Sequence, residues 1–303
     1  MSIASLSFKV VSTLHDKKRD KDLEPDPSVA AHYDIRYGKS KKYNRLDVYY
    51  PKGTRKKLPV IVNFHGGGYV YGTKQTYLHY GMFMASQGFV FVNPSYHLAP
   101  GKKYPTQLEE LNQVMAWMAR HQNDYYMDVD NVFIVGDSAG AQLALQYATL
   151  YSNPEYDQLF SFQLAKGYTL RGVALNCGMY NIYEKMASFD KKDKKDADIE
   201  LVVLLNDYLG KDWREHEKQL AIKDYIGKAF PPAFVMTAEH DFLRDEALPM
   251  VEALNQRGVD VTYKKYGEEG EKQYSHIFHC NLNLDEAKET NRDQCSFFKS
   301  LIR

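Results

Sequence analysis

Ser138 occurs in the pentapeptide GDSAG (residues 136–140), which joins an apolar run to a helical pattern. The run NVFIV (131–135) predicts a buried strand, and Leu143 and Tyr147 recur at helical spacing beyond the motif. The two glycines permit a turn tight enough to bring strand and helix together, with the serine hydroxyl exposed at its apex. Glycine and serine also make ordinary surface turns, but this context predicts a nucleophile elbow.

A nucleophilic serine needs a histidine base and a carboxylate that orients the base, and the best candidate carboxylate is Asp241. In the chain order serine, acid, histidine, the acid follows a late strand, and Asp241 comes just after the apolar run AFVMTA (233–238). Glu239, Asp245 and Glu246 compete with it. Asp245 and Glu246 stand where a helix begins, so they are better explained as N-terminal capping residues.

The candidate base is His276, in a loop that follows the last expected strand. A lone histidine is more often structural than catalytic, and His279 is a competitor in the same loop, but the loop position favours His276. The two histidines with Cys280 could also suggest a metal site. No carboxylate or further histidine lies at ligand spacing, so we expect neither a metal nor a cofactor.

The tetrapeptide HGGG (65–68) ends another expected strand. Consecutive glycines allow backbone N–H groups to converge on a developing oxyanion with no side chain in the way. A flexible loop or a phosphate cradle is the alternative explanation. A phosphate-binding loop normally continues with Lys and Ser or Thr at the start of a helix, whereas Tyr69 follows here, so an oxyanion site is favoured.

Strand and helix patterns alternate from about residue 33 to the C-terminus, which predicts an α/β fold with a mainly parallel central sheet flanked by helices. The alternation breaks between residues 179 and 230, where a charge run (190–196) precedes a helical stretch (199–209). The signs of that run alternate, as is typical of a solvated surface. We expect one domain over residues 1–303, with 1–32 and 179–230 forming a cap. Expected strands cover 33–37, 45–50, 59–64, 89–92, 131–135, 171–176, 233–238 and 259–266, and expected helices include 77–87, 105–122, 246–257 and 285–301.

Composition excludes several classes of partner. Lys and Arg together number 39, as do Asp and Glu, so no global field would attract nucleic acid or an anionic membrane. No uncharged stretch approaches the ~20 apolar residues needed to span a bilayer, and no signal-peptide cleavage pattern is present. Three well-separated cysteines without a CxxC pair favour a reducing compartment. We expect a cytoplasmic protein that acts on a small molecule and binds no nucleic acid and no membrane; a homodimer is compatible with the sequence.

Taken together, these motifs make the chain resemble the hormone-sensitive-lipase-like branch of the α/β-hydrolases. The resemblance implies an α/β-hydrolase fold in which Ser138 is the nucleophile, His276 the base and Asp241 the orienting acid. It also implies oxyanion donors in the backbone amides of Gly67, Gly68 and Ala139, with the amide of Gly66 as an alternative. The likeness rests on HGGG (65–68) with Gly72, YHLAP (96–100), GDSAG (136–140), DFLRDE (241–246) and HIF (276–278).

The resemblance further implies a serine carboxylesterase that hydrolyses acetyl to butyryl esters through an acyl-enzyme, small O-acetylated sugars among them. The break in the alternation at 179–230, with Tyr180 and Tyr183 near the sheet edge, leads us to expect that the cap sets the acyl-chain length. An amide hydrolase similar to the arylformamidases is one alternative. A non-catalytic ligand-binding member of the fold is another, although all three triad residues are present. The chain departs from the usual family pattern at His97, where Arg is common, and at Ala141 and Ile277, where Gly is common, which leaves the shape of the substrate open.

Overall fold

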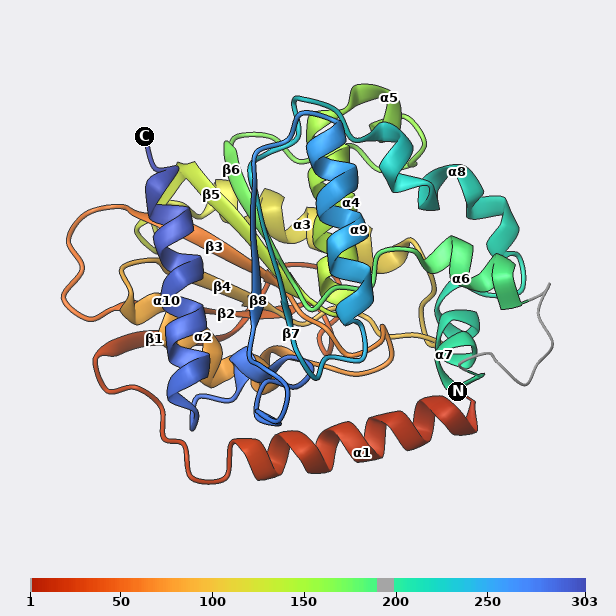
Figure 1. The fold of residues 1–303 in the computed structure, drawn as a ribbon. Helices are drawn as coiled ribbons and strands as arrows, with labels where there is room; N and C mark the ends of the chain where they lie inside the picture. Colours follow the sequence, from red (N-terminus) through yellow and green to blue (C-terminus); the bar gives the residue numbers. More distant parts are fainter. Residues whose placement is uncertain (1, 190–198) are drawn as a thin grey trace.

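The computed structural model describes residues 2–189 and 199–303. Within them, an eight-stranded sheet runs in the order β1-β2-β4-β3-β5-β6-β7-β8 (Figure 1). Its first strands pair antiparallel, β1 with β2 and β2 with β4, and every later pair is parallel. The predicted mainly parallel sheet is confirmed. The strands are β1 (Val29–Arg36), β2 (Arg45–Pro51), β3 (Leu58–Phe64), β4 (Val90–Pro94), β5 (Met127–Asp137), β6 (Leu170–Asn176), β7 (Ala233–Ala238) and β8 (Val261–Tyr266).

Helices cover both faces of the sheet, as a parallel sheet requires. One buried cluster packs the strands against α2 and α10, and the other packs them against α3, α4 and α9. The inner strands are therefore enclosed on both sides, and all five residues of β4 are buried. The covering helices are α2 (Leu78–Ser86), α3 (Thr106–Arg120), α4 (Ala139–Ser152), α9 (Arg244–Gln256) and α10 (Asp285–Ser300).

The parallel strands bring the candidate residues to one edge of the sheet. Strand β3 ends just before the HGGG loop, and β5 ends just before Ser138. Strands β7 and β8 end before Asp241 and the loop of His276. Because parallel strands point the same way, their carboxyl ends and the loops that follow them meet on one side of the molecule.

Further helices lie beyond this edge. The N-terminal helix α1 (Ile3–Arg19) runs along the outside of the molecule, with its first turn next to α7 (Ile199–Leu209) (Figure 1). The interruption between β6 and β7 also contains α6 (Ile182–Phe189) and α8 (Glu217–Leu220). One carboxylate oxygen of Asp207 in α7 accepts hydrogen bonds from the Ser2 amide, the Ser2 hydroxyl and the Ser5 hydroxyl, at 2.9, 2.8 and 2.6 Å.

Some element boundaries differ from expectation. Strand β1 begins at Val29, before the expected start at residue 33, because its first residues pair with the end of β2. The α1 helix was not expected from the sequence. The charge run at 190–196 lies outside the described residues. Across the described chain, every helix is too short or too polar to cross a bilayer.

Strand β3 packs closely against the start of α4 at the elbow, and a substitution at Gly140 tests this packing. A methyl group on Gly140 would overlap the backbone carbonyl oxygen of Phe64, whereas one on Gly227 would meet no atom within 4 Å. We expect Gly140→Ala to lower the free energy of unfolding by about 3 kcal/mol, the upper end of the usual cost of overpacking. Gly227→Ala should leave it within about 0.5 kcal/mol of wild type. Urea denaturation of the two variants measures both effects, and equal stabilities would contradict this account of the elbow.

Candidate active site

Ser138 stands at a sharp turn between β5 and α4. Its backbone angles are φ 54° and ψ −120°, a conformation that non-glycine residues rarely adopt. Its amide donates to the carbonyl oxygen of Asn176 at 2.9 Å, which holds the strained residue against the end of β6. The turn therefore has the backbone geometry of the predicted nucleophile elbow.

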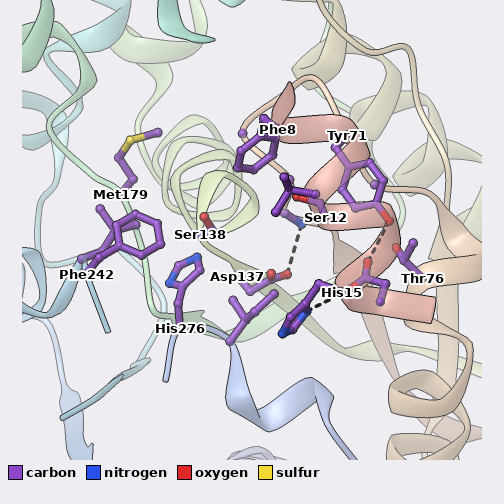
Figure 2. Close-up of a pocket in the computed structure, with 18 of the residues that line it drawn as sticks. Phe8, Ser12, His15, Tyr71, Thr76, Asp137, Ser138, Met179, Phe242 and His276 are labelled. Atoms are coloured by element: carbon purple, nitrogen blue, oxygen red, sulfur yellow. Dashed lines mark hydrogen bonds and ion pairs between the residues drawn. The ribbon is translucent and has the colours of Figure 1, made fainter. Parts of the chain in front are cut away.

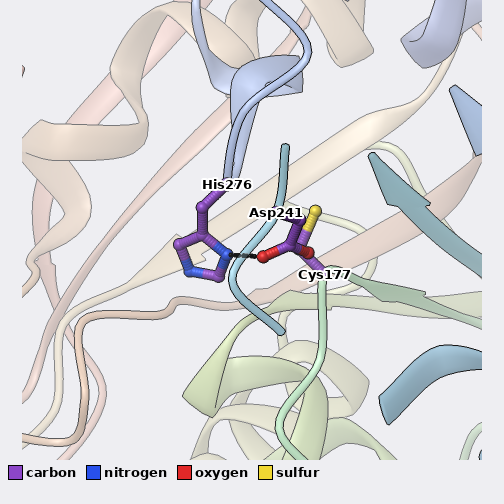
Figure 3. Close-up of side chains that lie close together, drawn as sticks. All are labelled: Cys177, Asp241 and His276. Carbon is purple, nitrogen blue, oxygen red and sulfur yellow. Dashed lines mark hydrogen bonds and ion pairs between the residues drawn. The ribbon is translucent and has the colours of Figure 1, made fainter. Parts of the chain in front are cut away.

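Asp241 and His276 meet because the sheet continues briefly beyond β7 and β8. His240 and Ser275 form an isolated parallel bridge, and the His240 amide donates to the Tyr274 carbonyl oxygen at 2.9 Å. The residues that follow in each loop are thus side by side. The distance from His276 Nδ1 to Asp241 Oδ1 is 2.7 Å (Figure 3). With Nδ1–H donating to the carboxylate, Nε2 of the same ring is left facing away from Asp241.

The carboxylate of Asp241 is buried and surrounded by donors. It accepts from the Leu243 amide at 2.9 Å and from the Thr237 hydroxyl at 3.1 Å, besides the bond from His276. Burial by itself would raise the pKa of this carboxyl, but the hydrogen bonds from His276 and Leu243 outweigh it and lower the pKa below its usual value. Asp241 is therefore an anion at neutral pH that can orient the imidazole and stabilise its protonated form.

The HGGG loop supplies unengaged backbone donors. In the described structure the amides of Gly67, Gly68 and Ala139 donate to no internal acceptor. The Gly66 amide, by contrast, is occupied: it lies 2.9 Å from the Tyr77 hydroxyl and 3.1 Å from Asp137 Oδ1. The structure thus favours the three expected donors over Gly66 for a ligand oxygen.

A buried carboxylate connects this loop to the elbow. Asp137 precedes Ser138, and its Oδ2 accepts from the Tyr77 hydroxyl at 2.8 Å while its Oδ1 accepts from the Gly66 amide. Burial raises the pKa of Asp137 to about 6, against the lowering effect of these hydrogen bonds. Sequence reasoning treated Asp137 only as part of a motif and gave Tyr77 no role beyond a helix start.

A cavity of about 600 Å³ opens over Ser138. Figure 2 shows Ser138 and His276 facing it, with Met179 and Phe242 on one side and residues of α1 on the other. In this structure the Ser138 hydroxyl makes no hydrogen bond to His276; such bonds are often long before a substrate is bound. The cavity is lined mainly by Phe8, Val11, Ser12, His15, Gly67, Gly68, Tyr71, Met179, Leu201, Leu204, Phe242 and Ile277.

The α1 wall is the part of the site that sequence reasoning missed in detail. A Cβ atom added to Gly68 would lie 3.4 Å from the Leu204 side chain and 3.5 Å from the Phe8 side chain, so α7 and α1 close over the glycine loop. A segment 1–32 was expected to form part of a cap, but no residue in it was expected at the site. The spacing of Phe8, Ser12 and His15 on one helical face was the available signal.

The competing residues have other environments. His279 is buried away from the cavity, and burial lowers its pKa to about 3, so it is neutral. Glu239 pairs with Arg244 and Lys265. Glu246 lies in the first turn of α9, as expected, and its carboxylate also contacts α6 through Lys185 Nζ at 2.6 Å. None of these groups lines the cavity.

Cys177, Asp241 and His276 form a compact group whose ligand atoms lie within 4.8 Å of one another (Figure 3). Of the three residues that the sequence analysis weighed for a metal site, His276 belongs to this group, and His279 and Cys280 do not. Burial raises the pKa of the Cys177 thiol well above its usual value, and the neighbouring Asp241 carboxylate raises it further. A metal ion would have to ionise this thiol and break the bond between Asp241 and His276, so the donor set fits a hydrogen-bonded acid and base better than a metal site.

Comparisons with known proteins agree with this architecture. A family model described as alpha/beta hydrolase fold matches residues 61–275. The protein R526 of Acanthamoeba polyphaga mimivirus, described as an alpha/beta hydrolase, is 29% identical over 223 residues, which are 69% of this chain and 59% of that protein. The versiconal hemiacetal acetate esterase of Dothistroma septosporum is 30% identical over 222 residues, 72% of this chain and 67% of the relative.

Among solved structures, esterase B from Lactobacillus rhamnosis superimposes on this chain with a TM-score of 0.87. The superposition covers 98% of this chain and 94% of the other, at 22% sequence identity. At that identity the likeness concerns the fold alone. The superposition extends over the N-terminal region, which lies before the start of the family-model match at residue 61.

The raised pKa of Asp137 predicts how its replacement changes stability with pH. The folded carboxyl titrates near 6 and an unfolded one near 3.8, so the folded state binds the proton more tightly between these values. Wild-type stability should therefore fall, relative to Asp137→Asn, as pH rises from about 4 to about 6. Over this pH range, the free energy of unfolding of wild type should fall by at most ~3 kcal/mol relative to that of Asp137→Asn. Urea denaturation at several pH values measures it, with Asp128→Asn on the partly exposed start of β5 as the control; a difference independent of pH would contradict the burial argument.

Proposed function

Because the chain belongs to the alpha/beta hydrolase fold family, in its hormone-sensitive-lipase-like branch, we propose that it is a serine carboxylesterase. One observation carries the proposal: the Asp241–His276 hydrogen bond stands beside a strained serine at the floor of a cavity that also receives unengaged backbone amides. This combination supplies a nucleophile, a base with its orienting acid, and donors for an oxyanion. Esterase activity of related proteins supports the same reaction class.

In the proposed mechanism, the Ser138 hydroxyl oxygen attacks the ester carbonyl carbon while Nε2 of His276 takes its proton. The amides of Gly67, Gly68 and Ala139 donate to the resulting oxyanion. As the tetrahedral intermediate collapses, His276 returns the proton to the departing alcohol, which leaves the acyl group on Ser138. A water molecule, deprotonated by His276, then releases the acid and restores the serine. Asp241 stays ionised throughout and stabilises the imidazolium.

We propose that the segments 1–32 and 179–230 act together as a cap that limits acyl length. Phe8 from α1 and Leu204 from α7 stand over Gly68, close to where the oxyanion would be held, so they restrict the space beside the ester carbonyl. We therefore expect acetyl to butyryl groups to be preferred. The acetate esterase among the relatives agrees with a short acyl group, and small O-acetylated sugars are a suitable class of substrate.

Two other functions would use the same residues differently. An amide hydrolase similar to the arylformamidases needs the same triad and oxyanion donors, so comparing rates on an acetyl ester and on N-formylkynurenine decides between them. A non-catalytic binding protein would need a blocked or absent triad. Labelling of Ser138 by a fluorophosphonate probe would exclude that role, and failure of the folded protein to react would support it.

The nucleophile is tested by Ser138→Ala, which removes the attacking oxygen. We expect hydrolysis of p-nitrophenyl acetate to fall by at least about 1000-fold, because a triad acts as a unit. Ser152→Ala is a matched control on the same helix; its hydroxyl donates to the Ala148 carbonyl oxygen away from the cavity, so its activity should match wild type. Wild-type activity in folded Ser138→Ala would overturn the mechanism.

The cap is tested by Phe8→Ala, which enlarges the space beside the oxyanion site. We expect the ratio of kcat/KM for the hexanoyl ester to that for the acetyl ester to rise about 10-fold or more, since each added methylene that finds apolar space is worth ~0.8 kcal/mol. Leu6→Ala, on the outer side of the same helix, is the control and should leave the ratio unchanged. An unchanged ratio in Phe8→Ala would contradict the role of α1.

A further inference from the structure

An ordinary surface helix turns its apolar side toward the core, whereas α1 turns its apolar side outward. Its inner side is largely polar. Ser5 donates to Asp207, Asp16 accepts from the Tyr71 hydroxyl at 2.9 Å, and Arg19 donates to the Thr76 carbonyl oxygen at 2.7 Å. These bonds reach α7, the segment after the glycine loop and the turn before α2. The helix is thus attached to the body of the protein at both ends by polar contacts.

The opposite side of α1 is apolar and open. Ile3, Leu6, Val10 and Leu14 follow one another at helical spacing, and we call them the outer face of α1. Ile3 is 88% exposed and Leu14 is 63% exposed. With Val11, these residues make up five of the eleven large hydrophobic side chains that are exposed in the described structure. Single exposed apolar residues are normal, but a continuous row on one helix marks a binding surface.

The exposed charged side chains of α1 itself have one sign. Lys9, Lys17 and Lys18 are exposed, and none of them forms an ion pair among the described residues. The one carboxylate of the helix, Asp16, is turned inward to Tyr71 and Arg19. Acidic residues resume after the helix, where Arg19 holds Asp20 and where Asp22 and Glu24 are exposed. The outer face is therefore a row of aliphatic side chains bordered by cations.

We propose that the outer face of α1 docks the protein on an anionic lipid surface. An apolar helix side with flanking lysines matches the acyl and headgroup regions of such a surface, with the helix lying in the interfacial plane. A second copy of the chain fits less well. It would bring three more lysines and no free carboxylate of α1 to the same contact, so the like charges would repel.

The position of the outer face links docking to the cavity. Phe8, Val11 and His15 of α1 line the cavity, while Leu6, Val10 and Leu14 point away from it. A docked helix therefore holds the mouth of the cavity close to the lipid surface, where esters that partition into the interface are concentrated. The sequence analysis argued against a membrane partner because the net charge of the chain is zero. That net charge is a sum over the whole chain and does not describe the local charges on α1.

Co-sedimentation of the full chain with vesicles tests docking without using turnover. Wild type should bind vesicles of phosphatidylcholine with phosphatidylglycerol at least ~10-fold more tightly than vesicles of phosphatidylcholine alone, and added salt should weaken the binding. The double variant Val10→Gln, Leu14→Gln should lose binding to the vesicles, because it lacks the apolar part of the contact. The double variant Lys17→Gln, Lys18→Gln should bind the anionic vesicles on the order of 10-fold more weakly, because it lacks two of the positive charges.

Leu248→Gln is the matched control, because Leu248 is exposed on α9, away from α1; its vesicle binding should equal wild type. Hydrolysis of a soluble acetyl ester and the melting temperature should stay unchanged in every variant, since none of the altered residues lines the cavity. Failure of wild type to bind, equal binding to neutral vesicles, or full binding by the Val10 and Leu14 variant would overturn the proposal. A dimer in sedimentation equilibrium that this variant dissociates would assign the face to a second copy instead.

Discussion

The burial of Asp137 is the constraint on which the candidate site depends. Its carboxylate lies between the elbow, which follows it in the chain, and the glycine loop, which it holds through the Gly66 amide and the Tyr77 hydroxyl. Desolvation of this group is unfavourable, as its raised pKa shows, so the fold retains it at a cost in stability. In return, the amides of Gly67 and Gly68 are held in a fixed position relative to Ser138. Preorganised donors of this kind need no rearrangement when negative charge develops in front of them.

The parts of the site that the sequence predicts are those governed by local rules. Gly140 must lack a side chain because the backbone of β3 passes next to it, and that need is visible in the motif itself. The place of His276 within the loop after the last strand favours it over His279, and the structure buries His279 beside Asn176 and Cys280. The pairing of Asp241 with His276 follows from the parallel register of β7 and β8, which the strand patterns also imply.

Contacts between segments far apart in the chain could not be predicted in the same way. That Tyr77 would reach Asp137, or that Phe8 would stand over Gly68, depends on how a loop and a helix pack in three dimensions. The substitution of histidine for the arginine common at position 97 is similar: His97 Nδ1 lies 2.6 Å from Glu110 on α3, a partner that no local pattern identifies. Propensity and periodicity describe one element at a time, whereas these contacts need the arrangement of several.

Helix α1 shows why an amphipathic pattern does not by itself determine which side faces inward. The apolar positions Leu6, Val10 and Leu14 would ordinarily be placed against the core. Here α7, the segment after the glycine loop and the turn before α2 offer polar partners instead: Asp207 accepts three hydrogen bonds from Ser2 and Ser5, Asp16 accepts one from Tyr71, and Arg19 donates to Thr76. These polar contacts at both ends of the helix hold its polar side inward. The same orientation presents Phe8 to the cavity and leaves the aliphatic row to the outside, so the wall of the site and the outer face have one common cause.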